Sequence, residues 1–190
     1  MASRLIAIIG GIGSGKSVVS RILRVMGYPV YDTDSGARRL MNGDQALKKR
    51  LIARFGPEIY SQEGQLDARR LSSIVFNDHE ALLALNGIVH PAVKQDVQSW
   101  ARQCEARYAF AETALLYESG MNQIVDAIWK VTAPARVRVE RVIARNGLPE
   151  AQVRARIEAQ RIEDRDDAKA QVIVNDGCEA VLPQVVRLLK

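Results

Sequence analysis

The apolar residues of this chain form short unbroken runs, separated by longer stretches in which they recur every three or four positions. Residues 5–9 are one such run, followed directly by glycines, and this pattern indicates a strand that is buried on both faces of a parallel sheet. From Lys16 onward the spacing is helical, and Gly27 is placed to end that helix. Residues 29–32 can form a second short strand. The N-terminal part therefore predicts a βαβ unit with a glycine turn after its first strand.

The rest of the chain continues this alternation after a long helical stretch. Residues 35–102 carry helical spacing with breaks at Gly56-Pro57 and Glu63-Gly64, and we expect a mostly helical insertion between the second and third strands. Further strands are expected at 108–112, 127–133 and 171–174, and further helices at 134–146, from 148 to about 164, and at the C-terminus. Strands that alternate with helices predict an α/β protein with a three-layer α/β/α fold around a parallel sheet.

The turn between the first strand and the first helix carries a specific chemical pattern. It reads Gly10-Gly11-Ile12-Gly13-Ser14-Gly15-Lys16-Ser17, which matches G-x-x-x-x-G-K-[ST]. Glycines allow the chain to curl so that its N–H groups point at phosphates, and the following helix adds its positive end. Lys16 is then a point charge for the phosphates, and the Ser17 hydroxyl is placed to bind Mg²⁺. A glycine turn with an incidental lysine is the alternative. We predict a nucleoside triphosphate site formed by Gly11, Gly13, Ser14, Gly15, Lys16, Ser17 and Val18.

Two other groups of charged residues suit phosphoryl transfer. Asp32 and Asp34 close the second strand at the same edge of the sheet as the glycine loop, so one can meet the metal while the other deprotonates an acceptor hydroxyl. The alternative is that this pair caps the following helix. Arg141 and Arg145 stand one helical turn apart before a predicted hinge, where a lid would bring guanidinium groups onto the transferring phosphoryl. The alternative for the two arginines is a solvated helix face.

Charge and composition narrow the class of protein only in part. The formal net charge of +5 and the pI near 9.4 suit a nucleic-acid binder as well as an enzyme that handles polyphosphates. No apolar stretch approaches a transmembrane span, and glycines interrupt the N-terminal apolar run, so we expect a cytoplasmic protein. Cys104 and Cys178 lie in no CxxC or Cys/His cluster, which argues against a disulfide framework or a zinc site.

Taken in order, the motifs of the chain resemble those of the dephospho-coenzyme A kinase family, in the nucleoside monophosphate kinase-like branch of P-loop proteins. The resemblance covers nearly the whole chain. After the glycine loop it rests on Tyr31-Asp32-Thr33-Asp34, Ala37-Arg38, Phe55-Gly56, Gly64-x-Leu66, Val75-Phe76, Leu85-Asn86-x-Ile88-x-His90-Pro91, Leu115-Leu116-Tyr117-Glu118, Arg141-x-x-x-Arg145, Arg156-Ile157-x-x-Gln160 and Asn175-Asp176-Gly177. The glycine loop alone would indicate only a superfamily, whereas the ordered series is far more specific.

The resemblance implies that ATP phosphorylates the ribose 3′-hydroxyl of dephospho-coenzyme A, the final step of coenzyme A synthesis, with Mg²⁺ as the metal. It implies that Asp34 is the general base, that Lys16 and Arg145 neutralise phosphate charge, and that Asn175 lies near the adenine. It further implies acceptor contacts by Asp34, Arg38, His90 and Arg141, and a metal held by Ser17 and Asp32. We expect a small-molecule substrate, no nucleic-acid or membrane partner, and a monomer or small homo-oligomer.

The resemblance also divides the chain. It implies one P-loop kinase domain over residues 1–190, with a core of 1–34, 103–134 and 165–190, a coenzyme-A-binding insertion of 35–102 and a lid of 135–164. We expect His90-Pro91 to end a helix, and a packing role for His90 is as consistent with the sequence as substrate contact. The candidates to meet the diphosphate of the acceptor are Arg38, Arg39, Arg69, Arg70 and Lys94.

The sequence departs from the family's usual residues at several positions, which we expect to lie away from the phosphate chemistry. The departures are Ala68 for Arg, Ala114 for Pro, Arg138 for Gln, and Ala170-Gln171 for Ala-Asp in a stretch one residue shorter. Three rival functions would each make a different demand on the chain. A nucleoside or nucleotide kinase of the same fold would need a smaller acceptor pocket, a GTPase switch would need an Asn-Lys-x-Asp that this sequence lacks, and a nucleic-acid-binding module would show salt-dependent retention of nucleic acid.

Overall fold

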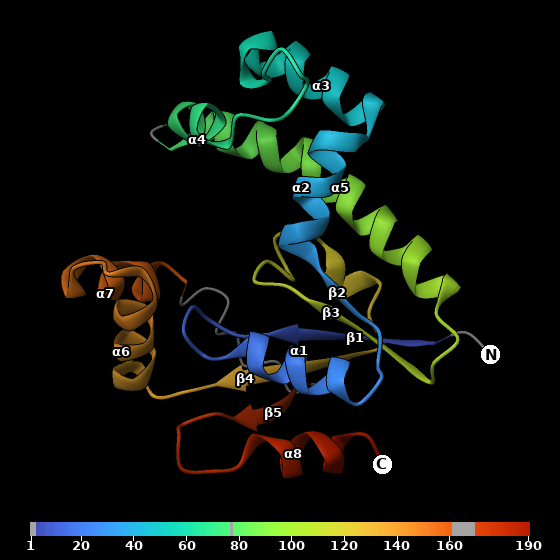
Figure 1. The fold of residues 1–190 in the computed structure, drawn as a ribbon, viewed down its shortest axis with the longest axis vertical. Coiled ribbons are helices and arrows are strands. Elements are labelled where there is room, and N and C mark those ends of the chain that lie inside the picture. Colours follow the sequence, from blue (N-terminus) through green and yellow to red (C-terminus); the bar gives the residue numbers. More distant parts are fainter. Residues whose placement is uncertain (1–2, 77, 161–169) are drawn as a thin grey trace. The chain divides into compact units, whose positions relative to one another are not determined.

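The structure, a computed structural model, describes residues 3–76, 78–160 and 170–190. The chain forms two compact units (Figure 1). The first unit contains residues 1–31 and 101–190, and the second contains residues 32–100.

A five-stranded sheet organises the first unit (Figure 1). Its strands are β1 (Arg4–Ile9), β2 (Val30–Asp32), β3 (Tyr108–Glu112), β4 (Ala127–Thr132) and β5 (Ala170–Val174), in the order β2-β3-β1-β4-β5. β1 pairs in parallel with β3 and β4, and β4 pairs in parallel with β5. The strands agree with the sequence prediction to within a residue or two. The two strands of the N-terminal βαβ unit, β1 and β2, are not adjacent in the sheet, because β3 lies between them.

Helices cover the sheet, because its strands carry apolar residues on both faces. On one face, α1 (Lys16–Val25) and α8 (Val181–Leu188) pack over Ile6, Ile8 and Trp129 in a single buried cluster. The alternate residues of β1, which are Leu5, Ala7 and Ile9, are also buried. A sheet that buries both faces is the expected middle layer of an α/β/α fold, and the prediction of this fold class is confirmed.

Two helices follow β4 and form a small core of their own. They are α6 (Ala135–Asn146) and α7 (Glu150–Ala159), and Gly147 ends α6 with a φ of 64°. Val139, Val142, Val153 and Ile157 are buried between them. Pro134 stands just before α6 in an extended conformation, rather than inside its first turn as the sequence suggested. The expected continuation of α7 to about residue 164 lies outside the described residues.

The second unit is built from helices. It contains α2 (Thr33–Gly43), α3 (Gln45–Phe55), the 3-10 turn η1 (Pro57–Ile59), α4 (Ala68–Val75) and most of α5 (His79–Gln103). An isolated antiparallel bridge between Tyr60 and Leu66 closes the loop after η1. The remaining short turn, η2 (Met121–Gln123), belongs to the first unit. Within the described part of the chain, no helix is both long enough and apolar enough to cross a bilayer.

The expected helix end at His90-Pro91 is wrong, because α5 continues through Pro91. Proline inside a helix forfeits one hydrogen bond and crowds the preceding turn, at a cost of about 3 kcal/mol. The helix nevertheless keeps one buried stripe on both sides of Pro91, formed by Val89, Val93, Val97 and Ala101. Burying each of the three valines contributes about 1.5–3 kcal/mol, and together they outweigh the cost of the proline.

Candidate active site

The glycine loop joins β1 to α1 at the carboxyl end of the central strand (Figure 1). Gly13 and Gly15 have φ angles of 78° and 96°, which a residue with a side chain rarely adopts. Lys16 is the first residue of α1, and its Nζ donates to the carbonyl of Gly10 at 2.6 Å. Ser17 is exposed on the first turn of the same helix. The loop therefore brings a cation, a hydroxyl and the positive end of a helix to one place.

Carbonyl groups of the loop are bonded by donors from distant parts of the first unit. Arg138 Nε donates to Ile12 O at 2.9 Å, and Asn175 Nδ2 donates to Ser14 O at 2.9 Å. A longer contact of 3.4 Å joins Arg141 Nη1 to Gly13 O. In a trans peptide the C=O and the next N–H point in opposite directions. The N–H groups of Gly13 and Gly15 are therefore turned away from these donors, as a phosphate cradle requires.

Arg138 and Asn175 also explain why the loop needs so many glycines. A Cβ at Gly11 would lie 2.1 Å from Arg138 Nη2, and a Cβ at Gly15 would lie 2.0 Å from Asn175 Nδ2. A Cβ at Gly13 would lie 2.6 Å from the carbonyl oxygen of Arg138. The pattern G-x-x-x-x-G-K-[ST] leaves positions 11 and 13 open. In this protein both positions are glycine because Arg138 of α6 lies too close to the loop backbone for a Cβ.

Asn175 and Arg141 join the end of β5 to the loop. The N–H of Asn175 donates to Thr132 O at 2.8 Å, and its carbonyl accepts from Arg141 Nη1 at 2.9 Å. Asn175 is only 8% exposed. N–H groups of Glu179 and Cys178 lower the pKa of the Asp176 carboxyl, and Arg141 lowers it further. The structure thus places Asn175 against the loop backbone, while a contact between Asn175 and adenine stays a prediction.

Other predicted nucleotide contacts are arranged less simply. Ser14 is 1% exposed, and its hydroxyl lies beside Gly10 without a hydrogen-bond partner among the described residues. Val18 is exposed on α1. Arg145 is exposed, and its Nε donates to Asn146 Oδ1 at 2.9 Å. Of the two arginines of the predicted lid, Arg141 contacts the loop. Arg145 instead bonds Asn146, the next residue in the chain.

The aspartates of the predicted catalytic pair begin α2 in the second unit. Asp32 Oδ1 accepts from the N–H groups of Asp34 and Ser35, at 3.0 Å each. The helix-capping alternative therefore describes Asp32 in this structure. Both bonds use the same oxygen of the carboxylate. Asp34 is exposed in the first turn of the helix.

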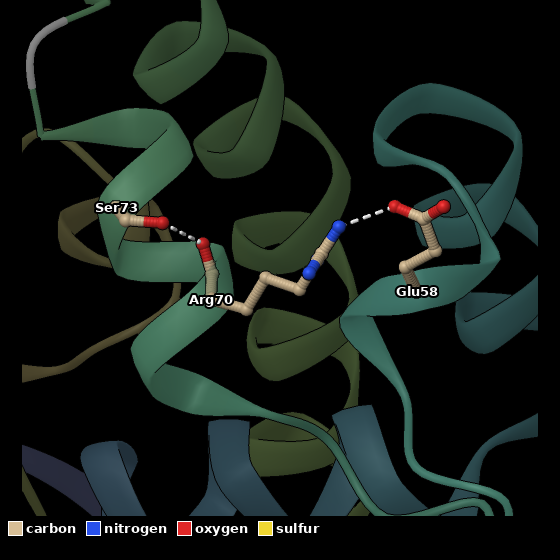
Figure 2. A network of polar contacts seen from close by, with 3 residues as sticks. All are labelled: Glu58, Arg70 and Ser73. Carbon is tan, nitrogen blue, oxygen red and sulfur yellow. Dashed lines mark hydrogen bonds and ion pairs between the residues drawn. The ribbon is translucent and has the colours of Figure 1, made fainter.

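Several predicted acceptor contacts lie elsewhere in the second unit. Arg38 is exposed on α2, and His90 is half-buried on α5. Arg70 on α4 pairs with Glu58 of η1, and its own carbonyl accepts from Ser73 Oγ at 2.7 Å (Figure 2). Arg39 pairs with Asp96. Arg39 and Arg70 therefore already serve contacts within the unit, while Arg38 and Arg69 present their charge to solvent.

Two residues at the loop were absent from the predicted site. Arg138 had a place only among the departures from the family's usual residues, and its side chain bonds the loop backbone at Ile12. Gln160 Oε1 accepts from the N–H of Ile12 at 2.7 Å. The only sequence signal for Gln160 was its place in the Arg156-Ile157-x-x-Gln160 segment. Among the described residues, no group of three or more His, Cys, Asp or Glu side chains could hold a metal by itself.

A parallel sheet with a phosphate loop after its central strand defines the P-loop nucleotide-binding fold. Shikimate kinase from Acinetobacter baumannii has this fold too, with a TM-score of 0.55 at 13% identity over 98% of this chain and 91% of that one. The model of the dephospho-CoA kinase family matches residues 4–180. The chain belongs to the dephospho-CoA kinase family.

Relatives over the whole length agree with that assignment. Dephospho-CoA kinase from Porphyromonas gingivalis is 39% identical over 97% of this chain and 92% of its own length. The structure of TT1252 from Thermus thermophilus is similar with a TM-score of 0.79 at 38% identity, covering 100% of this chain and 95% of that chain. Dephospho-CoA kinase from Campylobacter jejuni shares the fold, with a TM-score of 0.71 at 22% identity over 97% and 94% of the two chains.

Proposed function

We propose that this chain carries out the ATP-dependent dephospho-CoA kinase reaction of its family through the glycine loop, Lys16, Asp34 and the arginines of α6. The γ-phosphoryl of ATP passes to the ribose 3′-hydroxyl of dephospho-coenzyme A, and ADP and coenzyme A leave. The observation that supports this most directly is the loop itself, whose carbonyls are bonded from outside so that N–H groups face the opposite side. Positioning and charge neutralisation supply most of the rate in such transfers.

Lys16 supplies positive charge for the transferring phosphoryl. Its bond to Gly10 O keeps the ammonium at the mouth of the loop before ATP arrives. When ATP binds, the Lys16 ammonium can exchange the neutral Gly10 carbonyl for an anionic phosphate oxygen. The new hydrogen bond is stronger because it is charge-assisted. We assign the same purpose to Arg141, which already reaches Gly13, and to Arg145, whose exposed side chain is one helical turn further along.

Mg²⁺ suits the oxygen donors of Ser17 and Asp32. Hydroxyl and carboxylate oxygens are the ligands that Mg²⁺ prefers. The cap of α2 uses Oδ1 of Asp32, so Oδ2 remains for the metal or its water. When bound, the ion neutralises charge on the β- and γ-phosphates. Ser17 and Asp32 would hold the ion in place. Asp34 takes the proton from the 3′-hydroxyl.

The acceptor brings a diphosphate and a pantetheine arm, and the helical second unit offers exposed cations that suit an anionic ligand. Among them are Arg38 and Arg69, which are exposed, whereas Arg39 and Arg70 are paired with carboxylates. His90 is half-buried on α5 and completes the proposed acceptor set. We place the reaction in the cytoplasm, on a small molecule and without nucleic acid, in a monomer or small homo-oligomer.

The decisive experiment compares acceptors. Remote contacts to the diphosphate should help to position the 3′-hydroxyl, so an acceptor without that group should lose kcat as well as affinity. We expect kcat/KM for dephospho-coenzyme A to exceed that for adenosine or AMP by more than about a hundredfold. The phosphorylated position is read by NMR of the product. Equal rates with AMP, or phosphorylation of a 5′-phosphate, would show a nucleotide kinase instead.

A further inference from the structure

We infer that Arg138 and Gln160 act together as a clamp on the two peptide groups of Ile12 and thereby set the loop in its phosphate-binding form. They would be positioning residues of the ATP site, acting through the loop backbone. This inference rests on the proposed role of the loop in binding ATP. It assigns Arg138 and Gln160 a function in the reaction, where the sequence had assigned neither of them to the site.

The clamp bonds Ile12 on both sides. Gln160 Oε1 accepts from the N–H of Ile12 at 2.7 Å, and Arg138 Nε donates to the carbonyl of Ile12 at 2.9 Å. The first bond fixes the peptide between Gly11 and Ile12, and the second fixes the peptide between Ile12 and Gly13. Each peptide is planar and trans, so fixing one of its polar groups orients the other.

The two orientations have different consequences for the loop. With its N–H held by Gln160, the Gly11–Ile12 peptide turns its carbonyl the other way, where it accepts from the N–H of Ser14 at 3.1 Å. With its carbonyl held by Arg138, the next peptide turns the N–H of Gly13 away from α6. The first orientation closes the turn of the loop. The second supplies a donor for phosphate.

Packing reinforces the two hydrogen bonds. The Ile12 side chain packs against the core between α6 and α7, which contains Val139 and Val142. The positions of Gly11 and Gly13 have no room for a Cβ next to Arg138. Arg138 itself is 9% exposed, so its guanidinium is held mostly away from water beside the loop. The tip of the loop is thus docked on α6 and α7 by a side chain, two hydrogen bonds and close backbone contact.

Loss of one bond of the clamp frees a peptide of the loop to rotate, because glycine flanks Ile12 on both sides and adopts many conformations. ATP then binds only the fraction of molecules in which the loop is correctly formed, and its apparent Kd rises by the inverse of that fraction. Since the change removes one typical protein hydrogen bond, the apparent Kd for ATP should rise by about three- to tenfold. The binding of dephospho-coenzyme A, whose proposed contacts Asp34, Arg38 and His90 belong to the second unit and not to the loop, should not change.

The test uses Gln160→Leu, which removes the acceptor and keeps most of the bulk. The control is Gln152→Leu, at an exposed position of α7, the helix that ends just before Gln160. Titration calorimetry measures Kd for Mg-ATP and, separately, for dephospho-coenzyme A. We expect a rise of about three- to tenfold for Mg-ATP alone in Gln160→Leu, and no change in Gln152→Leu. Arg138→Ala should act in the same direction, with Arg136→Ala as its control; should Arg138→Ala fail to fold, Gln160→Leu decides.

Two results would overturn the inference. One is a Kd for Mg-ATP in Gln160→Leu within about twofold of the parent value, which is less than the loss of one hydrogen bond allows. The other is an equal weakening of both ligands, which would mean general structural damage. Lys16→Ala separates this inference from the proposed function: if Lys16→Ala binds Mg-ATP normally, the loop does not have its proposed role. If Lys16→Ala loses Mg-ATP while Gln160→Leu does not, only the clamp is wrong.

Discussion

Replacing Asn175 by alanine tests whether its amide holds the phosphate loop in place before any ligand binds. The change removes the 2.9 Å bond from Nδ2 to Ser14 O and the 3.3 Å contact of Oδ1 with Arg141. Ser14 is 1% exposed, so its carbonyl would be left largely without water and with only the long 3.5 Å contact from Arg141 Nη1. An unsatisfied buried group costs about 1–3 kcal/mol. In a chain of this size that corresponds to a fall in Tm of roughly 2–12 °C.

Thermal unfolding of the ligand-free protein, followed by circular dichroism, measures this cost. Asn175→Asp should fail to restore the Tm, because an acceptor then faces the Ser14 carbonyl where a donor stood. Asn122→Ala, at an exposed position, is the control and should leave the Tm unchanged. We also expect the Kd for Mg-ATP to rise by at least about threefold in Asn175→Ala. An unchanged ligand-free Tm combined with weaker ATP binding would refute the reasoning, since it would leave Asn175 as a nucleotide contact only.

Two further predictions concern the chemical step. Asp34→Asn should lower kcat by roughly 10²- to 10⁴-fold while Mg-ATP still binds, because the variant keeps the shape of the carboxylate and loses the base; reduced ATP affinity with little loss of turnover would instead make Asp34 a metal or structural residue. Arg145→Ala should lower kcat more than it raises KM for ATP, because charge on the phosphoryl group is greatest in the transition state. Steady-state kinetics checks this second prediction, which a change in KM alone would contradict, and Arg154→Ala on α7 is its exposed control.

Local patterns carried most of the fold prediction. A buried parallel strand leaves an apolar run such as residues 5–9, and a helix leaves a stripe, so the five strands were found from the sequence. The error at Pro91 has a definite cause. The rule that proline ends a helix considers only the cost of one lost hydrogen bond. In the structure this cost is offset by burial of the apolar stripe on either side of Pro91. The sequence predicts the capping role of Asp32 only as an alternative, because the end of β2 and the start of α2 meet at that residue.

By itself, the sequence determined that this protein has a phosphate loop between a buried strand and a helix, because the loop's glycines, lysine and serine are consecutive. The ordered motifs likewise indicated the kinase family. Only the tertiary structure decided what holds the loop, since its partners are remote: Arg138, Gln160 and Asn175 stand 126, 148 and 161 positions from the loop residues they bond. Such contacts leave no periodicity in the chain. They exist because β1, β4 and β5 are neighbours in the sheet, which brings the segments after β4 and β5 to the end of β1.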